Sequence, residues 1–212
     1  TASDIGTNTR SSFLTDTNLP SNFYRVSPND YAYSGYDRGH LCPSKDRTDT
    51  PEHNDQVFFM SNILPQHPVN NSGVWGQFEN YCRSLAQSTN NYELLILCGP
   101  SGFDGRRINT NGPVWIPGYV WKIVVVVPPG DGLAASRITV TNRVIALEIP
   151  NTGSATNAWT ATTTSAAEIE VELCPVPKQS WPLSVIFGYP LIPPCLRSSA
   201  NCPRRPVNNL CA

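Results

Sequence analysis

Three side chains used in acid–base and phosphate chemistry lie within one short segment, Tyr36-Asp37-Arg38-Gly39-His40. The unperturbed pKa of histidine lies near neutral pH, which suits His40 to accept or donate a proton during a reaction. Asp37 and Arg38 add a carboxylate and a guanidinium, and Gly39 would let the backbone approach a ligand closely. An isolated triplet of this kind is more often a surface ion pair beside a turn histidine. A second group of residues is therefore needed before an active site can be inferred.

The second group begins with the run Ser61-Asn62-Ile63-Leu64-Pro65-Gln66. The apolar stretch from Phe58 to Leu64 predicts a strand that Pro65 ends. A polar loop then leads into a helix predicted from Asn71 to Ala86. Apolar side chains at helical spacing predict the core face of this helix: Val74, Phe78, Cys82 and Leu85.

A second row of residues in the predicted helix, each four positions apart, lines one edge: Asn71, Trp75, Glu79 and Arg83. Alone, Asn71 would be a helix cap, and Glu79 with Arg83 an ordinary solvated pair. Trp75 is predicted to be a core residue whatever the function. The shared row places an amide, a carboxylate and a guanidinium on one edge, and the free N–H groups at the helix N-terminus favour a phosphate.

Phosphodiester hydrolysis is the chemistry that uses this set of groups. A phosphodiester repels hydroxide and gains charge at its transition state, so its hydrolysis needs a cation and a base directed at water. Magnesium prefers oxygen ligands and keeps several waters, so one amide oxygen together with the substrate phosphate is a sufficient anchor. No cage of cysteines or histidines is required. His53 and His67 are predicted to be solvated, and their spacing from His40 does not indicate a three-histidine zinc site.

The order of loop histidine, strand and helix bearing Asn and Glu resembles the DNA/RNA non-specific endonuclease family, whose catalytic unit is the ββα-metal (His-Me finger) motif. The resemblance runs from about Arg10 to about Pro150, and its most specific parts are YDRGHLCPSKDRT and SNILPQHPVNNSGVWGQFENYCRSL. It implies a magnesium-dependent, sugar-non-specific endonuclease that cuts DNA and RNA to 5′-phosphorylated oligonucleotides. Manganese or another divalent ion would be able to substitute.

The resemblance also implies a role for each residue of the site. His40 would be the general base and Asn71 the protein ligand of the magnesium ion, with Asp37 and Glu79 hydrogen-bonding the water shell of that ion. Three arginines would contact the scissile phosphate or the leaving group: Arg38, Arg83 and Arg10. Two amides are assigned to the substrate-binding set and would support the site from behind: Asn62 and Gln66. The family usually has a small residue in place of Lys45, which would pack behind His40 or reach a phosphate.

Three other functions compete with this interpretation. A nucleic-acid-binding module of reduced activity is disfavoured because no catalytic position is substituted. A toxin-type or mitochondrial-type nuclease controlled by a protein inhibitor is disfavoured by the many cysteines, although such an inhibitor stays a candidate partner beside DNA and RNA. A phosphodiesterase for small substrates is the third alternative. Comparing rates on long DNA, RNA and a dinucleotide analogue would distinguish it from a nuclease. The oligomeric state stays open.

Composition bounds the compartment and the partners. With 212 residues, 40% of them hydrophobic, the chain can form one globular domain. Low charge (15%) and seven cysteines indicate an oxidising compartment, hence a secreted protein, with the periplasm as the alternative. The odd count leaves at least one cysteine unpaired or intermolecular. Thr1 is not an initiator methionine, so we expect that the chain was processed.

The net charge of −1 argues against extended nucleic-acid binding, so a nuclease of this composition would rely on a local positive groove. Five cations would supply it: Arg10, Arg38, Lys45, Arg47 and Arg83. The longest apolar run, Ile123 to Val127, is far shorter than the ~20 residues of a membrane-spanning helix, so no membrane association is predicted.

The fold is predicted to be α+β, with a central, mainly antiparallel sheet, packed helices and the ββα-metal motif. Three apolar, β-branched runs predict the buried strands: 93–99, 121–127 and 143–149. Shorter signals predict a strand at 23–26, a helix begun at Thr50-Pro51, a turn at 100–102, Arg106 and Arg107 in a loop, and a capping box at Ser165. Residues 1–172 are assigned to the endonuclease domain, and 173–212 to a proline- and cysteine-rich tail.

Overall fold

The computed structural model describes residues 1–108, 114–155 and 158–173. A four-stranded antiparallel sheet forms its centre, in the order β3-β4-β5-β6. The strands are β3 (Glu93–Arg107), β4 (Trp115–Val127), β5 (Arg143–Pro150) and β6 (Thr163–Thr164). The predicted α+β class with a mainly antiparallel sheet is therefore confirmed. The predicted tail lies outside the described residues from position 174 onward.

The first strand of the sheet is longer than predicted. β3 continues through Pro100, which lies opposite Val120, so the predicted turn at 100–102 is wrong. Because β3 is an edge strand, a proline there need not remove a hydrogen bond from the ladder. Arg106 and Arg107 therefore end this strand instead of lying in a loop, and Arg107 stacks over the ring of Trp115 at 4.0 Å.

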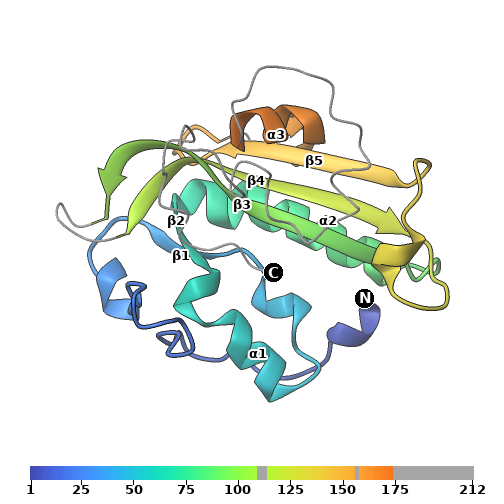
Figure 1. The fold of residues 1–212 in the computed structure, drawn as a ribbon, viewed down its shortest axis with the longest axis horizontal. Coiled ribbons are helices and arrows are strands. Elements are labelled where there is room, and N and C mark those ends of the chain that lie inside the picture. Colours follow the sequence, from blue (N-terminus) through green and yellow to red (C-terminus); the bar gives the residue numbers. More distant parts are fainter. Residues whose placement is uncertain (109–113, 156–157, 174–212) are drawn as a thin grey trace.

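Helices cover both faces of the sheet (Figure 1). On one face, α2 (Gly76–Ala86) packs Phe78 and Cys82 against the sheet, together with Val74 from the turn before it. The sheet residues of this core alternate along their strands: Val120, Val124, Val126, Ile145, Leu147 and Ile149. On the other face, Ile169 of α3 (Ala166–Leu173) contacts Trp121 and Ala146. The predicted capping box begins α3, since the Ser165 hydroxyl accepts from the Glu168 N–H at 3.1 Å.

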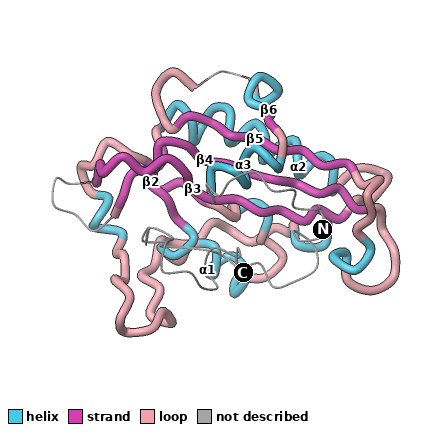
Figure 2. Tube along the Cα trace, turned by 45° about the horizontal axis from the view of Figure 1, so that its top comes forward, coloured by secondary structure: helices cyan, strands magenta, loops and turns pink. Residues whose placement is uncertain are grey.

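A separate two-stranded sheet carries the first group of candidate residues (Figure 2). β1 (Asp37–His40) pairs antiparallel with β2 (Ile63–Gln66), and His40 lies opposite Ile63. The strand predicted from Phe58 to Leu64 is wrong in its bounds, because residues Met60–Asn62 form a 3-10 turn and the strand continues through Pro65. Both strands of a two-stranded sheet are edges, where proline is tolerated.

The helix predicted from Asn71 to Ala86 has two parts. A π-helical turn, η5 (Asn70–Trp75), precedes α2, and Gly73 departs from helical geometry with φ −92° and ψ −111°. The predicted core face is confirmed, since Val74 and Phe78 are fully buried and Cys82 is 2% exposed. The kink at Gly73 separates the turn that carries Asn71 from α2, and the Asn71 N–H donates to the His67 carbonyl at 2.9 Å just beyond β2.

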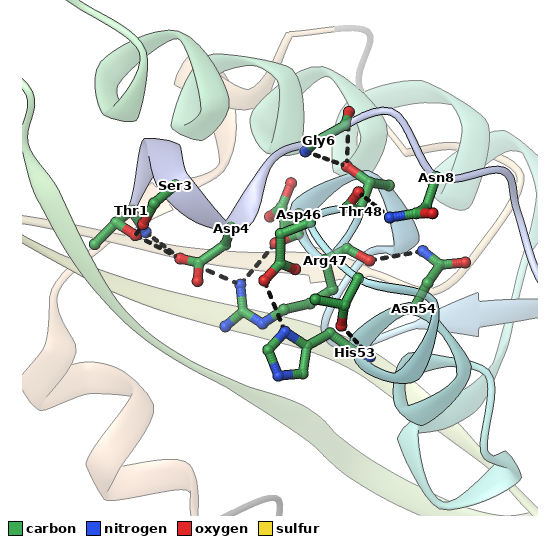
Figure 3. A network of polar contacts seen from close by, with 12 residues as sticks. Thr1, Ser3, Asp4, Gly6, Asn8, Asp46, Arg47, Thr48, His53 and Asn54 are labelled. Atoms are coloured by element: carbon green, nitrogen blue, oxygen red, sulfur yellow. Dashed lines mark hydrogen bonds and ion pairs between the residues drawn. The ribbon is translucent and has the colours of Figure 1, made fainter.

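The N-terminal segment lies across the loop that follows His40 (Figure 3). Backbone N–H groups of Thr48 and Asp49 donate to the carbonyl of Asp4, and the Gly6 N–H donates to the Thr48 hydroxyl at 2.8 Å. The predicted helix begins here as α1 (Pro51–Val57), and its cap Thr50 accepts from the His53 N–H at 3.1 Å. These contacts fix the path of the chain toward Arg10.

Short 3-10 turns make up most of the remaining described helices: η1 (Ala2–Asp4), η2 (Pro28–Tyr31), η3 (Ser44–Asp46), η6 (Ala134–Arg137) and η7 (Trp159–Thr162). The strand predicted at 23–26 is wrong, because this segment consists of turns and irregular chain. Among the described residues, no helix has the length and apolar character needed to cross a membrane.

Candidate active site

Two hydrogen bonds dock the start of the long helix across β1. The Asn71 amide nitrogen donates to Asp37 Oδ2 at 2.9 Å, and the Trp75 indole N–H donates to the His40 carbonyl at 3.2 Å. The partners are four residues apart on the helix and three apart on the strand, so the two elements run alongside each other. The structure thus joins Asn71 to Asp37 directly and to the His40 backbone through Trp75.

Two phenylalanines form the surface against which the His40 ring packs. The ring lies 4.9 Å from Phe58 in an edge-to-face arrangement and 5.4 Å from Phe13, measured between centroids. Its Nε2 is buried and has no hydrogen-bond partner in the described part of the chain. Burial, followed by the nearby Arg10 guanidinium, lowers the pKa of His40 from 6.5 to about 4. The imidazole is therefore neutral at neutral pH and ready to accept a proton.

The same aromatic pair positions two of the three predicted arginines. The guanidinium carbon of Arg10 lies 4.9 Å from the centroid of Phe58, and that of Arg38 lies 5.1 Å from the centroid of Phe13. Arg38 also donates to the carbonyl of Pro28 at 2.9 Å, while its Nε is buried without a partner among the described residues. Arg10, Arg38 and His40 therefore converge on one aromatic surface.

Glu79 and Arg83 lie one and two turns beyond Trp75 on the helix, in a network of charges of alternating sign. Arg83 donates to Asp46 Oδ1 and to Asn80 Oδ1, each at 2.6 Å. Glu79 Oε1 lies 3.8 Å from the ammonium of Lys122 on β4. Burial raises the pKa of Glu79 above its usual range, and the Lys122 ammonium opposes that rise. Arg83 is thus already paired with a carboxylate on the loop after His40.

The two amides predicted to bind substrate support the backbone instead. Asn62 is 5% exposed, accepts from the Cys42 N–H and donates to the carbonyls of Cys42 and Val57. Gln66 is 2% exposed and donates to Asn70 Oδ1 at 2.8 Å. Both side chains are buried and hydrogen-bonded within the protein, as the supporting role in the sequence analysis requires.

Gly39 is required for close approach, but the group that approaches it is not a ligand. A Cβ at this position would lie 2.1 Å from Oε1 of Gln66 and 2.6 Å from its Cβ. Any side chain at position 39 would therefore displace Gln66 from its bond with Asn70. The glycine keeps β1 and β2 in register around that amide.

Hard oxygen donors at the start of the helix fit a hydrated divalent cation. The Asn71 amide nitrogen is held by Asp37, so the carbonyl oxygen of Asn71 is the atom left to coordinate, and the Asp37 carboxylate lies beside it. Within the described residues, no group of three or more His, Cys, Asp or Glu side chains gathers in a metal-holding arrangement. A site of one amide with a neighbouring carboxylate suits a cation that keeps most of its own waters.

A comparison with known protein families decides the family. The model of the DNA/RNA non-specific endonucleases matches residues 1–172. The chain belongs to the DNA/RNA non-specific endonuclease family. As in the sequence analysis, the residues of the site fall within the matched range.

Relatives in this family share part of their length with the chain. A nuclease of Nostoc sp. is 46% identical over 159 residues, which cover 74% of this chain and 56% of the relative. Nuclease C1 of Cunninghamella echinulata is 34% identical over 153 residues, which cover 67% of this chain and 59% of the relative. The chain therefore spans less than two thirds of the length of these two relatives.

The fold is similar to that of a solved nuclease structure. The crystal structure of the EndoG/EndoGI complex, which concerns the mechanism of EndoG inhibition, superposes with a TM-score of 0.62 at 20% identity. The superposition covers 81% of this chain and 72% of that chain. At this identity the likeness establishes the fold alone.

Four residues of this non-specific endonuclease site were missed in the sequence: Phe13, Phe58, Asp46 and Lys122. The aromatic contacts join segments far apart in the chain, and no local pattern announces them. Lys122 did carry a signal, because a lysine within the apolar run that forms β4 must be buried beside a partner.

Proposed function

We propose that this chain is an endonuclease that hydrolyses phosphodiester bonds of both DNA and RNA. Family membership and the site geometry support this function. The observation that carries it is the pair of contacts that hold Asn71 at Asp37 and Trp75 at the His40 carbonyl, because they bring a hard oxygen donor and a neutral imidazole to one strand. Hydrolysis of a phosphodiester needs both groups.

His40 acts as the general base in this proposal. Because Nε2 is buried without a partner among the described residues, Nδ1 is the ring nitrogen left to take a proton from the attacking water. The contact with Phe58 holds the ring, so little rotational freedom is lost when the substrate binds. Arg10 and Arg38, which lie over Phe58 and Phe13, neutralise the phosphate oxygens in this proposal.

We propose magnesium as the cofactor, with manganese or another divalent ion able to replace it. Asn71 would hold the ion through its amide oxygen, and Asp37 and Glu79 would accept hydrogen bonds from its water shell. When bound, the ion supplies positive charge that stabilises the pentavalent transition state and the departing 3′ oxygen. Products carrying a 5′ phosphate follow from departure of that oxygen, and labelling of product ends with and without phosphatase treatment checks this.

A plasmid and an RNA transcript test the function. The purified chain is expected to cut both in magnesium and neither in excess EDTA, and His40→Ala is expected to lower the rate ~10²–10⁴-fold. His53→Ala is the matched control, because this exposed histidine of α1 pairs with Asp49 and has no contact with the aromatic pair among the described residues. The control should cut at the wild-type rate. Cleavage that survives both EDTA and the loss of His40 would contradict the proposal.

We further propose that the protein works in an oxidising compartment, either outside the cell or in the periplasm. The seven cysteines support this. Cys42, Cys82 and Cys98 form no disulfide with one another, and the other four cysteines lie outside the described residues. Thiol counting by alkylation and mass spectrometry under denaturing, non-reducing conditions is expected to find fewer than seven free thiols. Seven free thiols in the secreted protein would contradict it.

A protein inhibitor is a further proposed partner. The solved neighbour was crystallised as the EndoG/EndoGI complex, which supports an inhibitor-binding surface on this fold. Chromatography of the native protein from its source is expected to show a complex whose dissociation raises nuclease activity. Recovery of only free, fully active nuclease would argue against such a partner.

A further inference from the structure

Lys122 is a buried cation in the middle of the central sheet. It is 2% exposed and lies on β4 between apolar neighbours. Taking an ammonium group out of water costs several kcal/mol unless partners compensate for the lost hydration. A lysine in this position therefore requires a specific reason in its surroundings.

Those surroundings lie on the side of the sheet that faces the active-site helix. Because side chains alternate along a strand, Lys122 points to the same face as Val120 and Val124, where α2 packs. Its Nζ lies 3.8 Å from Glu79 Oε1 and 4.0 Å from the centroid of the Trp75 ring. Glu79 and Trp75 are four residues apart on the helix, so the one ammonium group contacts two successive turns.

Both partners lead directly to the candidate site. Trp75 donates its indole N–H to the His40 carbonyl, so the ring under the ammonium group is also fixed against β1. Glu79 lies in the same charge network as Arg83, which pairs with Asp46 on the loop after His40. The side chain of Glu79 is only 14% exposed, so its rotamer is set by these neighbours more than by solvent.

We infer that Lys122 is a positioning residue for this site: its ammonium group, held over Trp75, fixes the Glu79 carboxylate in the orientation that catalysis requires. Lys122 itself touches neither substrate nor cofactor. The inference rests on the proposed nuclease function, since turnover is the readout. The competing role is purely structural, in which the buried pair stabilises the fold and a catalytic effect is absent.

A double-mutant cycle separates these roles. Lys122→Met, Glu79→Gln and the double variant are purified, and kcat, KM for DNA and the magnesium concentration at half-maximal rate are measured for each. Lys122→Met is expected to lower kcat ~10–100-fold and to raise the magnesium requirement, with KM for DNA changed less than ~3-fold. In the Glu79→Gln background the same substitution should cost less than ~3-fold, because the group it orients is already altered.

Arg137→Met is the matched control. Arg137 forms a half-buried ion pair with Glu93. Glu93 lies five residues before Cys98 on β3, and Cys98 is opposite Lys122 in the sheet. Five residues of strand span roughly 17 Å, so this pair is remote from Glu79. The control is expected to lower the melting temperature while leaving kcat and the magnesium requirement unchanged.

The wild type and the variants distinguish failure of the inference from failure of the proposed function. A wild-type chain that does not cleave DNA refutes the function itself. With an active wild type, the inference is overturned if Lys122→Met keeps wild-type kcat, or if its loss is equally large in the Glu79→Gln background. If Lys122→Met does not fold, Lys122→Gln replaces it, because an uncharged donor can still reach Glu79. If that variant also fails to fold while Glu79→Gln does fold, the lysine serves stability alone and the inference is wrong.

Discussion

The two sheets of this molecule are held in place by different forces. Around the β1–β2 sheet, buried amides from this sheet and from neighbouring segments make directed hydrogen bonds: Asn62, Gln66, Asn70 and Asn151. In the four-stranded sheet, branched apolar side chains pack without directional bonds. Directed bonds fix orientation, whereas apolar packing mainly supplies stability. Substitutions around β1 and β2 should therefore change catalysis or the geometry of the site, and truncation of apolar side chains in the large sheet should change the free energy of unfolding.

The adjacent residues Asn70 and Asn71 give the largest expected contrast between a structural amide and a proposed catalytic one. Asn71→Ala removes the proposed coordinating oxygen and is expected to lower the cleavage rate ~10²–10³-fold, equivalent to several kcal/mol, with little change in stability. Asn70→Ala leaves Gln66 and the Pro150 carbonyl without partners and should cost about 1–3 kcal/mol of stability. Initial rates give the cleavage activity of each variant, and urea denaturation gives its free energy of unfolding. Similar rates for the two variants would break the contrast.

Leu147→Ala examines the large sheet. Leu147 is fully buried against α2, so its truncation is expected to lower the free energy of unfolding by about 2–5 kcal/mol. The rate per folded molecule should change less than ~2-fold. Chemical denaturation gives the free energy of unfolding, and active-site titration gives the rate per folded molecule. A large loss of rate with intact stability would show that the sheet contributes to catalysis directly.

Asn151 connects the two regions, so its substitution should affect both properties. Its Oδ1 accepts from the His67 N–H at 2.7 Å, and its Nδ2 donates to the carbonyls of Pro65 on β2 and Pro117 on β4. Asn151→Ala is expected to cost about 2–3 kcal/mol of stability and to lower the rate by less than ~10-fold. Thr152→Ala, at the neighbouring position, is the control. Wild-type stability and cleavage rate of Asn151→Ala would contradict a role for Asn151 in connecting the two sheets.

The pH dependence of kcat/KM gives a smaller effect with a defined sign. Burial and Arg10 lower the pKa of His40 to about 4, and the base works only when neutral. With magnesium saturating, the rate should stay nearly constant as pH falls from 8 to ~5.5, and should fall toward tenfold per unit only below His40's own pKa. An acidic limb that begins above 6.5, the ordinary value, would contradict the structure.

Much of the site could be predicted from the sequence because its signals are local. The segment from Asp37 to His40 and the apolar spacing of the helix lie within short windows, and the structure confirms the core face. The capping box at Ser165 was local in the same way. The helix was predicted to begin at Asn71, but Asn71 is the second residue of η5, and the non-helical geometry at Gly73 leaves no sequence pattern of its own.

The errors arise where tertiary position overrides a local rule. Pro65 and Pro100 were predicted to end strands, but both lie on edge strands, where a missing N–H is tolerated. Gly39 was interpreted as making room for a ligand, whereas it makes room for Gln66. Phe13 contacts His40 from a segment that no spacing rule connects to it.

Chemical rescue of His40→Ala tests the central claim most directly. Removal of the imidazole leaves a space beside Phe13 and Phe58, so free imidazole is expected to enter it and take over as the base. Initial rates on plasmid DNA in magnesium, measured against imidazole concentration, should rise at least tenfold for His40→Ala and stay flat for the wild type and for Asn71→Ala. A His40→Ala protein that is as active as the wild type without imidazole, or a rescue equally large in Asn71→Ala, would contradict the account.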